Sequence, residues 1–230
     1  MVIGTTVLVL LLGGAVVVDR VAVGRAEDRA VSELKANVEG VSGEPQVAIG
    51  GFPFLTQVAA GKLSDVTVSA DAVTLDGTEV TDVQVDAAGV TTAEPYTVDH
   101  AVLTGTLSAA ALQQLVATKT SVALDLAITG DELTAATKVL GLDVTATLVP
   151  RVENGQIRVD VATVSLGGLA VNVADLPGGL SGRLKDLAVP ISGLPDGFEL
   201  SGVVVRDGGV QLTATGLDVV LPASAAGPTP

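Results

Sequence analysis

The chain has 230 residues, enough for one large domain or two small ones. Its 26 Asp and Glu against 12 Lys and Arg give a net charge of −14, which excludes a nucleic-acid binder, because such proteins need a basic surface to displace counterions from phosphates. The absence of cysteine excludes disulfides, thiolate metal sites and cysteine nucleophiles, and a single histidine excludes a histidine metal cluster. We therefore expect no metal ion and no cofactor.

The first feature along the chain is a run of uncharged, mostly apolar residues from Val2 to Val18. As a helix this run would span about 26 Å, the short end of a transmembrane segment. No basic residue precedes it and no small-residue cleavage site follows it, so a cleaved signal peptide is not favoured. The sequence therefore predicts a transmembrane anchor over residues 1–18. Three arginines follow the run, and by the positive-inside rule alone they would place the next domain in the cytoplasm.

Residues 19–38 are predicted to form an amphipathic helix. Apolar residues recur at spacings of three and four while charged residues occupy the other sides, the pattern of a helix with one buried face. The apolar positions are Val23, Ala26, Ala30, Leu34 and Val38. Because such a stripe needs a partner, we expect this helix to pack against the sheet that follows rather than to form an exposed stalk.

From about residue 45 the hydrophobic period changes from 3.6 to 2, which predicts antiparallel strands with one apolar face. Asn154-Gly155 and Asp207-Gly208 separate alternating runs and predict two hairpins. Short helices are predicted over 54–60, 108–118 and 180–187. No linker divides the body of the chain, so we predict one domain over residues 19–221, followed by a disordered tail over 222–230.

Catalytic chemistry is weakly indicated. No Gly-x-Ser-x-Gly motif accompanies His100, so a Ser-His-Asp hydrolase is not favoured. Paired carboxylates would permit glycoside hydrolysis, but the spacing of the aspartates shows no such pair, and solvated strand faces are the simpler interpretation. These aspartates are Asp65, Asp71, Asp76, Asp82, Asp86, Asp99, Asp125, Asp143 and Asp160. We expect no catalytic residues, and a carboxylate-based envelope hydrolase is the less favoured alternative.

The segment from Ile49 to Leu55 is unusual because it holds two of the three phenylalanines, flanked by glycines and split by a proline. Two interpretations are open. The rings could form the mouth of an apolar cavity or touch a bilayer, or they could anchor the core where a strand turns into a short helix.

This segment, GGFPFLTQVAAGKLSDVTVSADAV, resembles the start of the actinobacterial LmeA-like phospholipid-binding family, in a G-x-P-F-L-T-Q stretch followed by a Gly and a V-x-V strand. The matching residues are Gly51, Pro53, Phe54, Leu55, Thr56, Gln57, Gly61, Val66 and Val68. The strand–turn–strand over 203–216 resembles the closing hairpin of the family. The resemblance covers residues 15–221, although no basic segment precedes the apolar run and no lipobox cysteine follows it.

The resemblance implies a fold of the α+β class: a mainly antiparallel, curved sheet packed around the N-terminal helix and short helices, similar to tubular lipid-binding domains. It implies a non-enzymatic phospholipid-binding protein of the cell envelope, anchored in the plasma membrane with its domain on the extracytoplasmic side, and a link to envelope glycolipid or mannan maturation. An apolar cavity would hold acyl chains; the main alternative is a structural or interaction domain without a ligand. The candidate lipid-binding residues are Phe52, Pro53, Phe54, Leu55 and Val58. Phosphate recognition would fall on a few cations such as Lys62, Lys119, Arg151 and Arg183.

Overall fold

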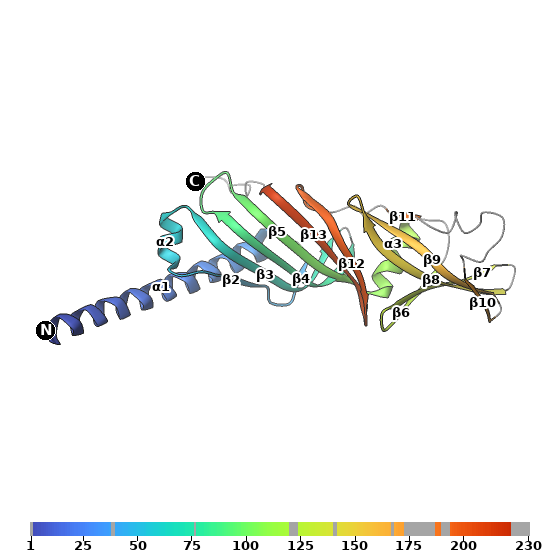
Figure 1. The fold of residues 1–230 in the computed structure, drawn as a ribbon, viewed down its shortest axis with the longest axis horizontal. Coiled ribbons are helices and arrows are strands. Elements are labelled where there is room, and N and C mark those ends of the chain that lie inside the picture. The colour runs from blue at the N-terminus through green and yellow to red at the C-terminus, as the bar shows by residue number, and fades with distance from the viewer. Residues whose placement is uncertain are drawn as a thin grey trace. The chain divides into compact units, whose positions relative to one another are not determined.

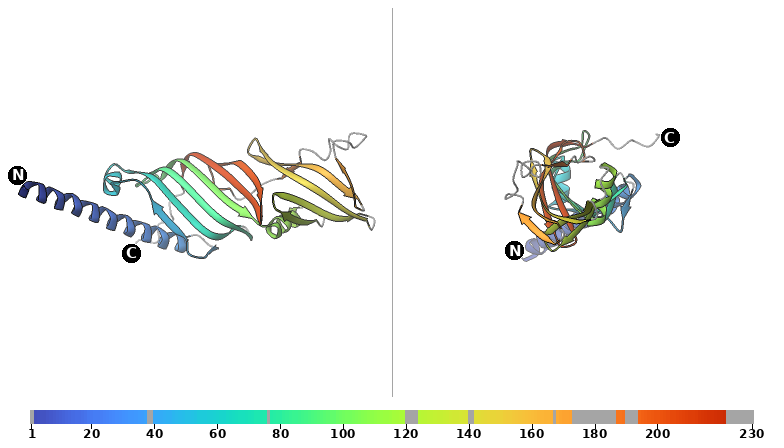
Figure 2. Two further views of the ribbon diagram at one scale, coloured as in Figure 1. Left: turned by 60° about the horizontal axis from the view of Figure 1, so that its bottom comes forward. Right: turned by 90° about the vertical axis from the view of Figure 1, so that its right-hand side faces the viewer.

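A computed structural model describes residues 2–37, 40–75, 77–119, 124–139, 142–166, 168–172, 187–189 and 194–221. The described residues form a mainly antiparallel β structure with a few helices, as predicted for the α+β class. Both sheets are curled (Figures 1 and 2). The predicted helix over 180–187 and the predicted tail over 222–230 lie outside the described residues, apart from Leu187, which is in a strand.

Three helices are described: α1 (Val2–Asn37), α2 (Phe54–Ala59) and α3 (Ala109–Lys119). The predicted amphipathic stripe on α1 is confirmed where the structure describes it, since Val23 is buried and Ala26, Ala30 and Leu34 are half-buried. This helix contacts α2 and β2 (Gln46–Ile49), as expected for a helix packed against the following strands (Figure 1).

The transmembrane anchor predicted over residues 1–18 is not supported. None of the helices in the described part of the chain is both long and apolar enough to cross a membrane. The prediction treated the apolar run and the charged helix as separate elements. The structure instead has a single helix, α1. It runs without a break from the apolar residues into Asp19, Arg20 and the later charged residues.

The first sheet, sheet A, has the strand order β1-β3-β4-β5-β13-β12 within the described residues, and β2 pairs with β3 beside β1. Its other strands are β1 (Val41–Ser42), β3 (Lys62–Leu75), β4 (Thr78–Thr91), β5 (Thr97–Leu107), β12 (Phe198–Arg206) and β13 (Gly209–Val220). The hairpin predicted at Asp207-Gly208 joins β12 to β13, and Gly208 has the positive φ of 92° that its turn requires.

The second sheet, sheet B, has the order β10-β9-β8-β7-β6, and β11 also pairs with β9. Its strands are β6 (Asp125–Thr129), β7 (Glu132–Val139), β8 (Leu142–Glu153), β9 (Gln156–Leu166), β10 (Leu169–Asn172) and β11 (Leu187–Val189). The hairpin predicted at Asn154-Gly155 joins β8 to β9. Both residues have positive φ, 51° and 70°, as the tight turn of a twisted hairpin requires.

The contacts group the chain into two compact units. Unit 1 comprises Met1–Asp71, Gln84–Val102 and Gly216–Pro230, and unit 2 comprises Ala72–Val83 and Leu103–Thr215. The buried apolar residues of unit 1 include Val23, Phe54, Ala70, Val98, Ala101 and Val219. Those of unit 2 include Leu107, Ala111, Leu133, Ala135, Ile157, Val161, Leu200, Val210 and Ala214. Small and branched side chains thus fill both cores, and Phe54 is the only aromatic residue among the buried residues described.

Candidate functional site

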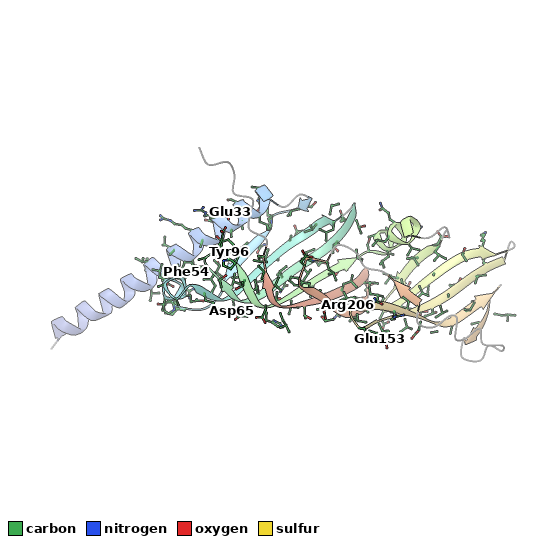
Figure 3. The ribbon with its side chains drawn as sticks, turned by 90° about the horizontal axis from the view of Figure 1, so that it is seen from above. Glu33, Phe54, Asp65, Tyr96, Glu153 and Arg206 are labelled. Atoms are coloured by element: carbon green, nitrogen blue, oxygen red, sulfur yellow. The ribbon has the colours of Figure 1, made fainter. Side chains whose placement is uncertain are left out.

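The structure divides the predicted lipid-binding segment into one buried anchor and an exposed apolar surface. Phe54, the first residue of α2, is buried with 7% of its surface exposed (Figure 3). Phe52 is 54% exposed, and Leu55 and Val58 are exposed as well; Pro53 is also exposed. The interpretation as a core anchor is confirmed for Phe54, whereas Phe52 is exposed, and its part in lipid contact stays a prediction.

A carboxylate from α1 holds the start of α2. Pro53 occupies the N-cap position and makes no side-chain cap, so the first amides of the helix need another acceptor. Asp19, only 3% exposed, supplies it: Phe54 N donates to Oδ2 at 3.1 Å and Leu55 N donates to Oδ1 at 2.9 Å. Asp19 thereby connects α1 to the segment that contains the apolar surface. In the sequence nothing marks Asp19 except that it is the first charged residue after the apolar run.

Gln57 closes the loop in front of α2. Its Nε2 donates to the carbonyl of Gly50 at 3.1 Å, and its Oε1 accepts from Ser64 N at 2.7 Å, so one side chain joins the strands on both sides of the helix. Gly51 has a φ of 82°, and a Cβ there would lie 2.6 Å from Gln57 Nε2. These contacts explain physically why a glycine and a glutamine stand at these two places in the segment.

Sheet B presents a second apolar surface, made of rows of aliphatic side chains. Residues directly opposite each other in antiparallel strands point to the same face. One row across the sheet runs Leu126, Ala135, Ala146, Val164, and the next runs Ile128, Leu133, Leu148, Val161. Ala162 is an extra residue in β9, because Thr147 pairs with Thr163 and Leu148 pairs with Val161, and this bulge keeps Val161 and Val164 on the same face. We call these eight residues the sheet B apolar face.

This face is only partly covered by the described residues. Leu133, Ala135 and Val161 are buried, and the other five residues of the face are half-buried. Within unit 2, β12 contacts β7, β8 and β9, and α3 contacts β6, where Leu126 N donates to Gln113 Oε1 at 3.4 Å. The helix predicted over 108–118 is confirmed as α3, and Ser108 caps it, since Ala111 N donates to Ser108 Oγ at 3.1 Å. The sequence showed the alternation of these strands, but not which rows they would form.

The opposite face of sheet B is polar. Thr134, Thr147 and Thr163 form one of its rows, and Thr147 donates to Glu132 at 2.9 Å. On the same face Arg151 contacts Glu153 at 2.7 Å and Asp160 at 3.2 Å. Glu153 is labelled in Figure 3. The hydrogen bonds that Arg151 donates to Glu153 and, to a smaller extent, to Asp160 raise the pKa of its guanidinium above the ordinary value. Sheet B is therefore amphipathic, with charges and hydroxyls on one side and aliphatic side chains on the other.

The other candidate residues lie apart from this face. Lys62 forms an ion pair with Asp99 at 2.5 Å, and Arg151 is paired on the polar face. Arg183 and the side chain of Lys119 lie outside what the structure describes. His100 is exposed on β5. In the described ranges, no group of three or more His, Cys, Asp or Glu is placed to hold a metal ion.

The aspartates considered for hydrolysis are mostly exposed in the described structure, so their burial does not indicate a catalytic site. Seven of the nine are exposed, Asp160 is half-buried, and Asp76 lies outside the described residues. Asp86 accepts from Thr67 at 2.9 Å and from Gln84 at 2.7 Å, and Asp99 pairs with Lys62. These contacts favour the interpretation of the carboxylates as polar groups on solvated strand faces.

Together, the curled antiparallel sheets and the partly covered aliphatic face define a β-rich protein with a few helices. Residues 17–215 match the LmeA-like phospholipid-binding family, and the chain belongs to this family. The predicted family resemblance is thereby confirmed. No match was found among curated proteins or among solved structures.

Proposed function

We propose that this protein binds phospholipid without carrying out a reaction on it, and that acyl chains lie against the sheet B apolar face. The observation that carries the proposal is the partial covering of this face: five of its eight aliphatic residues are only half-buried among the described residues. Membership of a phospholipid-binding family supports the choice of ligand.

Burial of the acyl chain can supply the binding free energy of such a site without any polar contact to the acyl chain. Each methylene group transferred from water to an apolar surface contributes roughly 0.8 kcal/mol, so one acyl chain of ordinary length suffices for useful affinity. Ala135 and Ala146 lie side by side in the middle of one row. Ala135 is buried and Ala146 is half-buried, so Ala146 is the more open position of the two.

The first experiment is native mass spectrometry of the full chain purified from cells, followed by lipid extraction. We expect a phospholipid bound in stoichiometric amount. A protein that carries none, and that takes up none from vesicles, would overturn the proposal and favour a structural domain whose sheet holds no ligand.

A larger side chain placed on the sheet B apolar face tests its role in lipid binding directly. We expect Ala146→Phe to weaken phospholipid binding by about tenfold, because a ring that displaces two methylenes forfeits roughly 0.8 kcal/mol for each. Ala146 is half-buried, so the ring has room to enter without displacing a tightly packed core. Bound phospholipid per protein, measured after extraction, is the readout, and thermal unfolding checks that the variant is folded.

The neighbouring residue offers a matched control. Thr145 precedes Ala146 in β8, points to the opposite face and is exposed. Thr145→Phe adds a similar ring to the same strand and is expected to leave lipid binding unchanged. Equal losses in both variants, or none in Ala146→Phe, would contradict a site on the apolar face.

We also propose that the protein acts on the extracytoplasmic side of the plasma membrane. The support is the resemblance of the segment around Phe54 to envelope proteins of the family. A contribution to envelope glycolipid or mannan maturation stays a prediction from the same resemblance.

The chain has no cysteine, which makes this location testable in intact cells. Leu169 is 77% exposed in β10, whereas Val161 is buried in β9. We expect a membrane-impermeant maleimide to label Leu169→Cys in whole cells and to label Val161→Cys only after denaturation. Labelling of Leu169→Cys only after lysis would place the chain inside the cell and contradict this location.

A further inference from the structure

An exposed apolar patch lies at the junction of α1 and α2, in unit 1. It consists of Phe52, Leu55 and Val58, with Val16 and Arg20 from α1, and we call it the α2 patch. Leu55 and Val58 are three residues apart on α2 and share a face, and Val16 lies one turn before Arg20 on α1. The Arg20 guanidinium lies 5.5 Å from the centre of the Phe52 ring, which joins the two helices at the surface. None of this surface belongs to the sheet B apolar face.

The charge around the α2 patch differs from that of the rest of the chain. Although the protein carries −14 overall, residues 50–61 contain no charged side chain. On the adjoining part of α1, residues 16–26, the charged residues are Asp19, Arg20 and Arg25. The carboxylate of Asp19 is buried against two amides of α2, and no carboxylate of the described residues pairs with Arg20 or Arg25. The only charged side chain of the α2 patch is therefore Arg20, which lies beside its exposed apolar groups. Glu27, the next acidic residue of α1, accepts from Ile49 N at 2.8 Å.

We propose that the α2 patch docks on the surface of a phospholipid bilayer that contains anionic lipid. An aromatic ring and aliphatic side chains at the headgroup boundary gain by leaving water, and an arginine beside them can keep its charge at the level of the phosphates. An acidic protein is repelled by such a surface as a whole. The approach is therefore oriented, with the α2 patch toward the lipid. For the identity of the partner, this inference rests on the proposed phospholipid binding.

The geometry of α2 suits such a contact because hydrogen bonds made by the side chains of Asp19 and Gln57 fix its backbone on the side away from the α2 patch. Asp19 binds the amides at the start of α2, and Gln57 joins the flanking strands. Phe54 is buried. Phe52, Leu55 and Val58 are thus presented on a segment that is anchored in unit 1, and docking needs no rearrangement of the helix.

Single-cysteine labelling of the full chain tests the proposal. Leu55→Cys places an environment-sensitive fluorophore on the α2 patch, and Leu169→Cys places it at an exposed leucine of β10. With vesicles of phosphatidylcholine and phosphatidylglycerol, we expect a blue shift at position 55, quenched by brominated lipids, and neither effect at position 169. No shift at position 55, or equal shifts at both positions, would overturn the docking surface.

Arg20→Gln, in the chain labelled at position 55, tests the part played by charge. We expect about fivefold weaker association with the anionic vesicles, the effect of one basic residue at a membrane surface. Lys35→Gln, an exposed cation near the other end of α1, is the matched control and should change little. Equal effects of the two substitutions would contradict a contact between Arg20 and the lipid surface.

Two further measurements separate this inference from the proposed lipid site. If Ala146→Phe lowers bound phospholipid while the shift at position 55 persists, docking and the sheet B apolar face are distinct, as proposed. If a short-chain phospholipid below its micellar concentration shifts the label as vesicles do, the α2 patch holds single lipids, and the docking proposal fails. A chain that carries no phospholipid but still shows the vesicle-dependent shift would leave docking standing and overturn the proposed function.

Discussion

Replacing Phe54 by alanine is expected to lower the free energy of unfolding by about 3 kcal/mol, the range for a buried phenylalanine reduced to a methyl group. Phe54 is buried in a core otherwise made of small and branched side chains. Denaturant unfolding of the full chain measures the loss, and in a chain of this size the melting temperature should fall by roughly 6–12 °C.

Phe52 provides the matched comparison, because it has the same side chain two residues earlier but is more than half exposed. Phe52→Ala should change stability by less than about 0.5 kcal/mol, as most surface substitutions do. Its effect should instead appear in the association with vesicles. Similar losses of stability in the two variants would mean that the ring of Phe52 is also packed, contrary to its exposure in the structure.

The second large effect is expected at Asp19. Removing its carboxylate with Asp19→Ala leaves the buried amide of Phe54 and the partly buried amide of Leu55 without their acceptor. A buried amide left without a partner costs about 1–3 kcal/mol, and a partly buried one costs less. We therefore expect a loss of about 2–4 kcal/mol in the free energy of unfolding. Backbone hydrogen exchange should locate the lost hydrogen bonds, because the two amides at the start of α2 should become less protected from exchange.

Asp19→Asn separates hydrogen bonding from charge. The asparagine keeps one carbonyl oxygen as an acceptor but replaces the other oxygen by a donor, which would face the amide of either Phe54 or Leu55. We expect a loss smaller than that of Asp19→Ala but still measurable. Asp28→Ala, at an exposed position of the same helix, should have little effect. Full stability in Asp19→Ala would contradict the capping role that the structure assigns to this carboxylate.

These two residues have consequences for lipid contact as well as for stability. Phe54 and Asp19 are buried and fix the position of α2, whereas Phe52, Leu55 and Val58 are exposed. Substitutions of the two buried residues should therefore impair folding and vesicle association together. Substitutions on its outer surface should impair association alone, and this contrast distinguishes the two groups in a single set of variants.

Several elements were predictable from the sequence because their causes are local. Asn154 and Gly155 tolerate the positive φ of a tight hairpin, so the turn between β8 and β9 is encoded by two adjacent residues. Ser108 caps α3 with its own hydroxyl, and Gly61, with a φ of 78°, follows the end of α2. The alternation of apolar and polar residues likewise placed the strands, since successive side chains point to opposite faces.

The division of the Phe52–Val58 segment was not predictable in this way. Both phenylalanines have the same side chain in the same short segment, and no local preference distinguishes them. Their burial depends on where α1 lies, and α1 is joined to α2 through Asp19, 35 residues before Phe54. Hydropathy likewise predicted an anchor separate from the helix that follows, because the period of apolar residues does not show that the two stretches form one continuous helix.

The sequence by itself determined the α+β class, the hairpins, two of the short helices and the membership of a phospholipid-binding family. These depend on backbone preferences, on the period of apolar residues and on a motif written in consecutive positions. Only the tertiary structure decided which phenylalanine is buried, that Asp19 caps α2, and which strands align their aliphatic residues into one half-covered face. Those outcomes depend on partners far apart in the chain, which are selected by packing and by the need of each buried polar group for a hydrogen bond.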